Sequence, residues 1–123
     1  GAVRCVNAET LLACSFVVAG ATVNHILKIA PSEVTFVVTG GYNNDEDIAC
    51  AEYLESLFKG HNPDQEPFVK RVYDSRDAIA HHDVTMPEFP KSDLDYCTRF
   101  NAFDFAMPIT RKNDQLTMQA IKP

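Results

Sequence analysis

The sequence lacks any apolar run long enough to cross a bilayer. A membrane-spanning helix needs about 20 consecutive apolar residues, whereas the longest run in this chain, Leu11 to Val23, is interrupted by Ser15, Gly20 and Thr22. The residues given also contain no secretory signal pattern. We therefore expect a protein with no membrane partner.

Paired cysteines are also missing. The four cysteines form no C-x-x-C motif, and Cys14 and Cys50 lie inside apolar segments, as small buried hydrophobic residues do. No neighbour that would activate a thiol stands beside them in the sequence. This pattern favours a reducing, cytoplasmic setting over a disulfide framework.

Clusters of basic side chains are scarce. The 123 residues carry a formal net charge of −6, and the adjacent basic pairs, Lys70-Arg71 and Arg111-Lys112, are interpreted as solvated surface. Acidic surfaces repel phosphate backbones, and nucleic-acid sites gather basic residues on one face. The charge therefore argues against a nucleic-acid partner. The length fits one domain or a part of a larger one.

The first half of the chain alternates strand and helix patterns. Thr10–Val18 is a nearly continuous apolar run, which is typical of a strand buried on both faces. Ala21–Ile29 then predicts a helix, Glu33–Thr39 a second strand, Gly40–Asn44 a loop and Asp45–Lys59 a helix. Elements in this order predict two parallel neighbouring strands joined by a right-handed crossover.

The second half predicts shorter elements. Phe68–Ala80 has helical spacing, and Ser92–Arg99 predicts a short helix with a cap at its start. Phe103–Ile121 predicts two short strands joined by a turn at Lys112–Asp114. The run His81–Asp83 is expected at a polar helix end, because no further residue is spaced to complete a zinc site.

The segment from Thr39 to Asp47 is the best candidate for a functional site. It follows a predicted buried strand and opens a helix, and ligands in open α/β sheets bind at the carboxyl ends of strands. Gly40 and Gly41 let backbone amides approach an anion closely, and a helix N-terminus adds free N–H groups. The segment therefore suits a small phosphorylated or sulfonated anion, although it is not a Walker A loop.

Glu46 and Asp47 are the candidate acids of that segment. Helical spacing aligns Asp47 with Cys50 and Glu46 with Tyr53, so both carboxylates begin the core-facing side of the helix. A carboxylate in that position needs a partner, and Mg²⁺ binds through one or two carboxylates together with phosphate oxygens. The alternative is that the acids only complement the helix dipole, an effect of about 0.3–1 kcal/mol each.

Several stretches of the chain, taken in order, resemble one protein family. Ala13–Ala19 is similar to the GSFLNA strand of the 2-phosphosulfolactate phosphatase family. Val37–Gly40 followed by Asp45–Ala51 is similar to the VCAG strand, loop and EDxxCAG helix of that family. Leu94–Cys97 with Phe103–Pro108 resembles its C-terminal segment, so the ordered match covers nearly the whole chain.

The resemblance implies an α/β fold, namely an α/β/α layered domain with a mainly parallel or mixed sheet. The chain would be a single domain of this kind or the C-terminal half of a larger one. The resemblance also implies Mg²⁺-dependent hydrolysis of a phosphomonoester, which in the family is 2-phospho-3-sulfolactate. Glu46 and Asp47 match the family's acidic pair and are the expected catalytic residues, with Asp47 as the expected Mg²⁺ ligand. Ser15, Gly40 and the adjacent Gly41 are the expected substrate-binding residues.

The chain departs from the family pattern in two ways. The Asn of GSFLNA is Val18 here, and the family's N-terminal motifs, a DVxRA-type strand end and an Asn-Gly-Thr loop, are absent from the chain. The leading hypothesis is a phosphatase-like domain whose chemistry requires the missing half or a partner chain. One alternative is a non-catalytic remnant that binds a small anion or serves as an assembly domain, and another is an unrelated α/β module. Part of a larger sheet exposes an edge and apolar surface, so we expect a homo-oligomer or a contact with the missing half.

Overall fold

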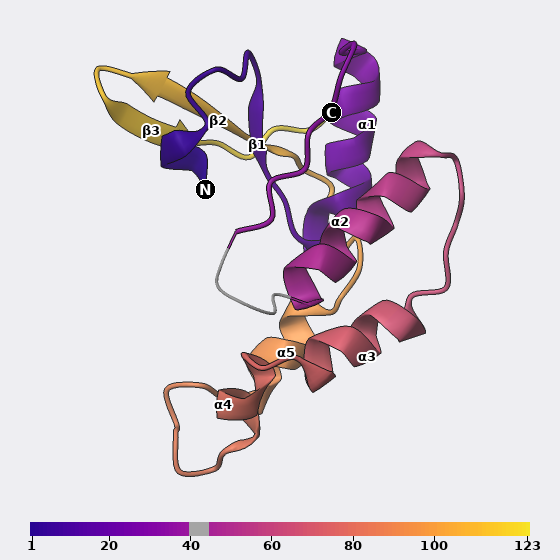
Figure 1. Cartoon of the computed structure of the whole chain (residues 1–123), viewed down its shortest axis with the longest axis vertical. Helices are drawn as coiled ribbons and strands as arrows, with labels where there is room; N and C mark the ends of the chain where they lie inside the picture. Colours follow the sequence, from indigo (N-terminus) through magenta and orange to yellow (C-terminus); the bar gives the residue numbers. More distant parts are fainter. Residues whose placement is uncertain (40–44) are drawn as a thin grey trace.

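The computed structural model describes residues 1–39 and 45–123, in which a small antiparallel sheet lies beside a group of helices (Figure 1). None of the helices in these residues is long and apolar enough to cross a membrane. In chain order, the described elements are the 3-10 turn η1 (Ala2–Arg4), β1 (Leu11–Ala13), the 3-10 turn η2 (Phe16–Val18), α1 (Ala19–Ile29), α2 (Asp45–Phe58), α3 (Glu66–Asp74), α4 (Ala78–His82), α5 (Lys91–Cys97), β2 (Met107–Lys112) and β3 (Gln115–Met118).

The sheet is antiparallel throughout. Strand β2 lies in the middle, and its residue Ile109 pairs with Leu11 of β1 on one side and with Met118 of β3 on the other. Asn113 and Asp114 form the turn between β2 and β3 with φ values of 49° and 60°. Left-handed backbone at both central residues is what a tight two-residue hairpin requires, so the predicted hairpin and its turn are confirmed.

This sheet shows that the predicted fold class is wrong. The expected α/β/α domain with a mainly parallel or mixed sheet required Thr10–Val18 and Glu33–Thr39 to lie side by side as parallel strands. Instead, the first run contributes only β1, which pairs antiparallel with β2, and residues 33–39 are assigned to no strand. An apolar, β-branched run is compatible with a strand but does not specify which segment pairs with it.

A loop from the second half of the chain holds the backbone that follows β1. The N–H of Asn101 donates a hydrogen bond to the carbonyl of Phe16, and the N–H of Phe103 donates one to the carbonyl of Val17, both at 3.0 Å. The N–H of Gly20 donates to Oδ1 of Asn101 at 2.7 Å, and a Cβ on Gly20 would lie only 2.9 Å from that oxygen. The carbonyls that a longer strand would offer to a neighbouring strand are therefore satisfied by this loop, and the chain turns through η2 into α1.

The helices follow the predictions except over Phe68–Ala80. Helix α5 lies close to the expected Ser92–Arg99. Helices α1 and α2 nearly coincide with the expected Ala21–Ile29 and Asp45–Lys59. The single helix expected over Phe68–Ala80 is wrong, because α3 and α4 are separate. Between them Ser75 has an extended backbone (φ −67°, ψ 156°), and its Oγ accepts a hydrogen bond from the N–H of Ala78 at 3.3 Å. Serine side chains that bond nearby backbone in this way favour helix ends over helix interiors.

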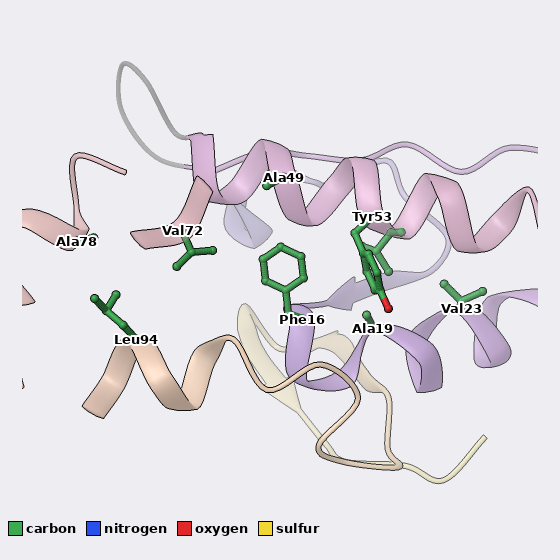
Figure 2. Packing of buried hydrophobic residues seen from close by; sticks show 9 residues of the cluster. Phe16, Ala19, Val23, Ala49, Tyr53, Val72, Ala78 and Leu94 are labelled. Atoms are coloured by element: carbon green, nitrogen blue, oxygen red, sulfur yellow. The ribbon is translucent and has the colours of Figure 1, made fainter. Parts of the chain in front are cut away.

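One aromatic cluster lies at the centre of the core (Figure 2). The ring of Phe16 points from η2 toward α2 and is 5% exposed, and Tyr53 of α2 is 1% exposed. The Phe16 ring centroid lies 4.4 Å from that of Phe100 and 5.8 Å from that of Tyr53, which in turn lies 5.3 Å from Phe68. The other buried members of the cluster come from α1 to α5 and are Ala19, Val23, Ala49, Leu54, Val72, Ala78 and Leu94.

We expect Phe16→Ala to lower the free energy of unfolding by about 3–5 kcal/mol, because it leaves a cavity among the other rings of the cluster. Urea-induced unfolding followed by circular dichroism measures this change. Phe103→Ala is the matched control, since that ring is 52% exposed and its removal should cost clearly less. Equal losses in the two variants would contradict a central position for Phe16.

Candidate functional site

An arginine neutralises Asp45, the first residue of α2. Oδ1 of Asp45 accepts hydrogen bonds from Nε of Arg71 at 3.0 Å and from its Nη2 at 2.6 Å, and Nη1 of Arg71 contacts Glu52. The hydrogen bond from Arg71 holds the pKa of Asp45 below its ordinary value. Arg71 thus ties α3 to α2, and its side chain is only 28% exposed, so its interpretation as solvated surface is wrong.

Glu46 and Asp47 follow in the first turn of α2, and both are half-buried. Oε2 of Glu46 is buried and makes no hydrogen bond with any residue that the structure describes. Burial raises the pKa of Asp47, and the negative charge of Asp77 raises it further. Within the described part of the chain neither acid forms an ion pair. The two predicted acids therefore differ from Asp45 in having no ion-pair partner among residues 1–39 and 45–123.

Asp77 is a neighbour of the site that the sequence did not reveal. It is the residue that precedes α4, it is exposed, and its charge acts on Asp47. The helix predicted over Phe68–Ala80 would have had no break near this position. The approach of Asp77 to α2 depends on the interruption at Ser75, and no sequence motif marks it.

Ser15 lies between β1 and η2, where it is half-buried and has an extended backbone (φ −152°, ψ 174°). The thiol of Cys14 donates a hydrogen bond to the Ser15 carbonyl at 3.5 Å. Cys14 and Cys50 of α2 pack against the same hydrophobic cluster, and each thiol shifts the pKa of the other. Cys50 stands one helical turn after Asp47. The structure therefore brings the segment that carries Ser15 against the helix that carries the predicted acids.

A shallow hollow of about 500 Å³ lies beside the start of α2, toward the junction of α3 and α4. Neither Glu46 nor Asp47 lines it. Successive helical residues point about 100° apart, so Asp45 can face this hollow while the next two acids face elsewhere. The residues that line the hollow are Asp45, Ile48, Asp74, Ser75 and Arg76.

The carboxylate oxygens at the start of α2 are of the kind that Mg²⁺ binds. No group of three or more histidine, cysteine, aspartate or glutamate side chains is placed to hold a metal ion in residues 1–39 and 45–123. Mg²⁺ does not require such a group, because it binds through one or two carboxylates with water and phosphate oxygens. A cation would satisfy the buried Oε2 of Glu46 and offset the desolvation of Asp47. Gly40 and Gly41, predicted to bind the substrate, lie outside the described residues.

His81 and His82 end α4, so the predicted polar helix end is confirmed. Nδ1 of His81 lies 3.1 Å from the carbonyl oxygen of Pro90, and Nε2 of His82 lies 3.3 Å from that of Tyr73. These contacts hold α4 against its neighbours.

Comparison with curated proteins finds a relative that matches almost the entire chain. Over 122 residues, the chain is 28% identical to the probable 2-phosphosulfolactate phosphatase of Bacillus subtilis (strain 168). The chain is similar to one part of that protein. The aligned region covers 98% of this chain and 54% of the relative, so the chain spans about half the length of the curated relative it matches. The resemblance predicted from the sequence motifs is confirmed at this level. No protein-family model and no solved structure matches the chain.

We expect Asp47→Asn to make the protein more stable at neutral pH. A carboxyl group whose pKa is raised by folding binds its proton more tightly in the folded chain, so stability falls as the pH rises from the unfolded pKa through the folded pKa. Asparagine carries no charge and removes this loss. Urea unfolding at about pH 4 and about pH 7, with a chelator present, should therefore show a smaller decrease in the variant than in the wild type.

Asp93→Asn is the control for this experiment, because Asp93 is also in the first turn of a helix but is exposed. It shows what the loss of an exposed carboxylate at a helix start does in the same measurement. If wild type and Asp47→Asn lose the same stability between the two pH values, Asp47 is not desolvated as described.

Proposed function

We propose that this chain forms the acid-bearing part of a Mg²⁺-dependent phosphatase that hydrolyses a small phosphomonoester. The observation that carries the proposal is the state of Glu46 and Asp47 at the N-terminus of α2. Both are half-buried and form no ion pair with any residue that the structure describes, whereas Asp45 beside them is paired with Arg71. The similarity to one part of a probable 2-phosphosulfolactate phosphatase supports this reaction class.

In this proposal the two acids have different roles. Asp47, with Glu46 beside it, would hold Mg²⁺, which when bound stabilises negative charge on the transferred phosphoryl group. Glu46 would act as a general base and accept a proton from the water that attacks phosphorus, while the bond from phosphorus to the alcohol oxygen breaks and that oxygen takes up a proton. The N–H groups at the start of α2 would orient the anion, with Ser15, Gly40 and Gly41 as further proposed substrate contacts.

The substrate class is a small phosphorylated or sulfonated anion. The acidic chain, with a net charge of −6, concentrates no cationic surface for a polymer such as nucleic acid. The name of the Bacillus subtilis relative offers 2-phosphosulfolactate as the first compound to test. Fold and family do not determine the substrate, so related phosphomonoesters belong in the same assay.

Glu46→Gln and Asp47→Asn should each lower the rate of Mg²⁺-dependent hydrolysis of p-nitrophenyl phosphate by about 100-fold or more, because each removes a group that acts on the reacting atoms. The assay uses the protein in its native assembly, with the release of p-nitrophenol as the signal. Glu55→Gln is the matched control on the same helix, since Glu55 is 54% exposed and pairs with Lys59. Absence of Mg²⁺-stimulated hydrolysis by the wild-type assembly contradicts the proposal.

A second candidate function, as an assembly domain, is favoured by the segment predicted to be a buried strand. Its apolar side chains Val34, Phe36, Val37 and Val38 are 37–55% exposed, although the Phe36 ring packs 6.1 Å from that of Phe58 at the end of α2. Contiguous exposed apolar side chains of this kind are typical of interaction surfaces. A second copy of the chain is the proposed occupant, and the part of the relative that this chain does not match is the competing one.

Light scattering tests the assembly. We expect a mass above the 13.7 kDa of one chain, and Val37→Lys should shift it toward the monomer because it places a charge in the contact. Val84→Lys is the control, since Val84 is 97% exposed and lies outside this segment. A monomeric wild type at working concentration contradicts self-association through this surface.

A further inference from the structure

Cys14 and Cys50 form a pair of thiols that the candidate phosphatase chemistry does not use. They are 36 positions apart (50 − 14) in the sequence, but the segment after β1 meets α2 at this point. Phe16, two residues after Cys14, has its ring centroid 5.8 Å from that of Tyr53, three residues after Cys50, and each thiol shifts the pKa of the other. Both are free, partly buried and packed against the same hydrophobic cluster. Cys5 is likewise a free thiol, and Cys97 is exposed, but neither has another cysteine as a partner among the described residues.

The two thiols differ in their surroundings. Interaction with the Cys50 thiol lowers the pKa of Cys14 against the opposing effect of burial. The same interaction and burial raise the pKa of Cys50, and the charge of Asp47 adds to the increase. We take Cys14 as the attacking thiol and Cys50 as the resolving thiol.

We propose that Cys14 and Cys50 are a redox pair that closes into a reversible disulfide between the β1–η2 segment and α2. A thiol–disulfide exchange between groups already in contact requires little rearrangement, whereas cysteines whose backbones are far apart cannot be bridged. The bond would fix the distance between the segment carrying Ser15 and the helix carrying Asp47. The proposal does not depend on the phosphatase function, because it concerns only the two sulfur atoms.

Glutathione disulfide, a low-molecular-weight disulfide, supplies the oxidising equivalents. The Cys14 thiolate attacks one of its sulfur atoms, a mixed disulfide forms, and one glutathione thiolate leaves and takes up a proton. Cys50 then attacks the Cys14 sulfur and transfers its own proton to the second departing glutathione thiolate. Two protein thiols and one glutathione disulfide thus give one protein disulfide and two molecules of glutathione.

Peptide mapping tests the proposal directly. In the Cys5→Ser/Cys97→Ser background, Cys14 and Cys50 are the remaining thiols of the four. Incubation with glutathione disulfide followed by trypsin should yield residues 5–28 joined to residues 29–59, with the loss of two hydrogen atoms. Dithiothreitol should separate the two peptides. The matched control is Cys14→Ser/Cys50→Ser, in which Cys5 and Cys97 remain and no such crosslink between the peptides should form.

Thermal unfolding gives a second measurement that does not depend on activity. The oxidised protein should unfold at a temperature roughly 10 °C higher than the reduced protein, because the crosslink restricts the unfolded chain. Separate glutathione adducts on Cys14 and Cys50 without a crosslink would overturn the proposal. So would unmodified Cys14 and Cys50 in the wild type under conditions that fully modify the exposed Cys97.

Discussion

The packing of Phe16 against Tyr53 and Phe100 is the contact on which the rest of the structure depends. It joins three segments that are distant in the sequence: the turn after β1, helix α2 and the loop before β2. The ring reaches this position because the backbone leaves the strand direction at η2, where the N–H groups of Asn101 and Phe103 bond its carbonyls. The same turn brings the Cys14–Ser15 segment against α2, so the candidate site and the thiol pair both follow from it.

The three consecutive acidic residues at the start of α2 have similar carboxyl groups but different surroundings. Asp45 is stabilised as a charge by Arg71, whereas burial and Asp77 disfavour the charge of Asp47. Glu46 buries an oxygen that no described residue satisfies. A helix dipole alone would favour all three carboxylates to a similar extent. The difference among them comes from α3 and α4, and it is what marks the second and third acids as candidates for a cation and a substrate.

Helix α2 carries the residues on which the three proposals depend. Its first turn carries Glu46 and Asp47, its second carries Cys50, and Phe58 at its end packs on the exposed apolar segment that includes Phe36. The chain spans about half the length of the curated relative it matches. Helix α2 therefore has the proposed catalytic residues at its start and the proposed assembly surface at its end. Cys50 of the proposed redox pair lies between them.

Local patterns in the sequence were sufficient for α1, α2, the β2–β3 hairpin and the polar end of α4, since spacing, glycine and turn residues act over a few positions. They also indicated Glu46 and Asp47 as site residues, and this assignment stays a prediction. Only the tertiary structure determined four other features. These are the sheet, the break at Ser75, the Asp45–Arg71 pair and the Cys14–Cys50 contact. Each of these depends on hydrogen bonds or packing between segments distant in the sequence, and the residue pattern of a single segment does not specify its partner.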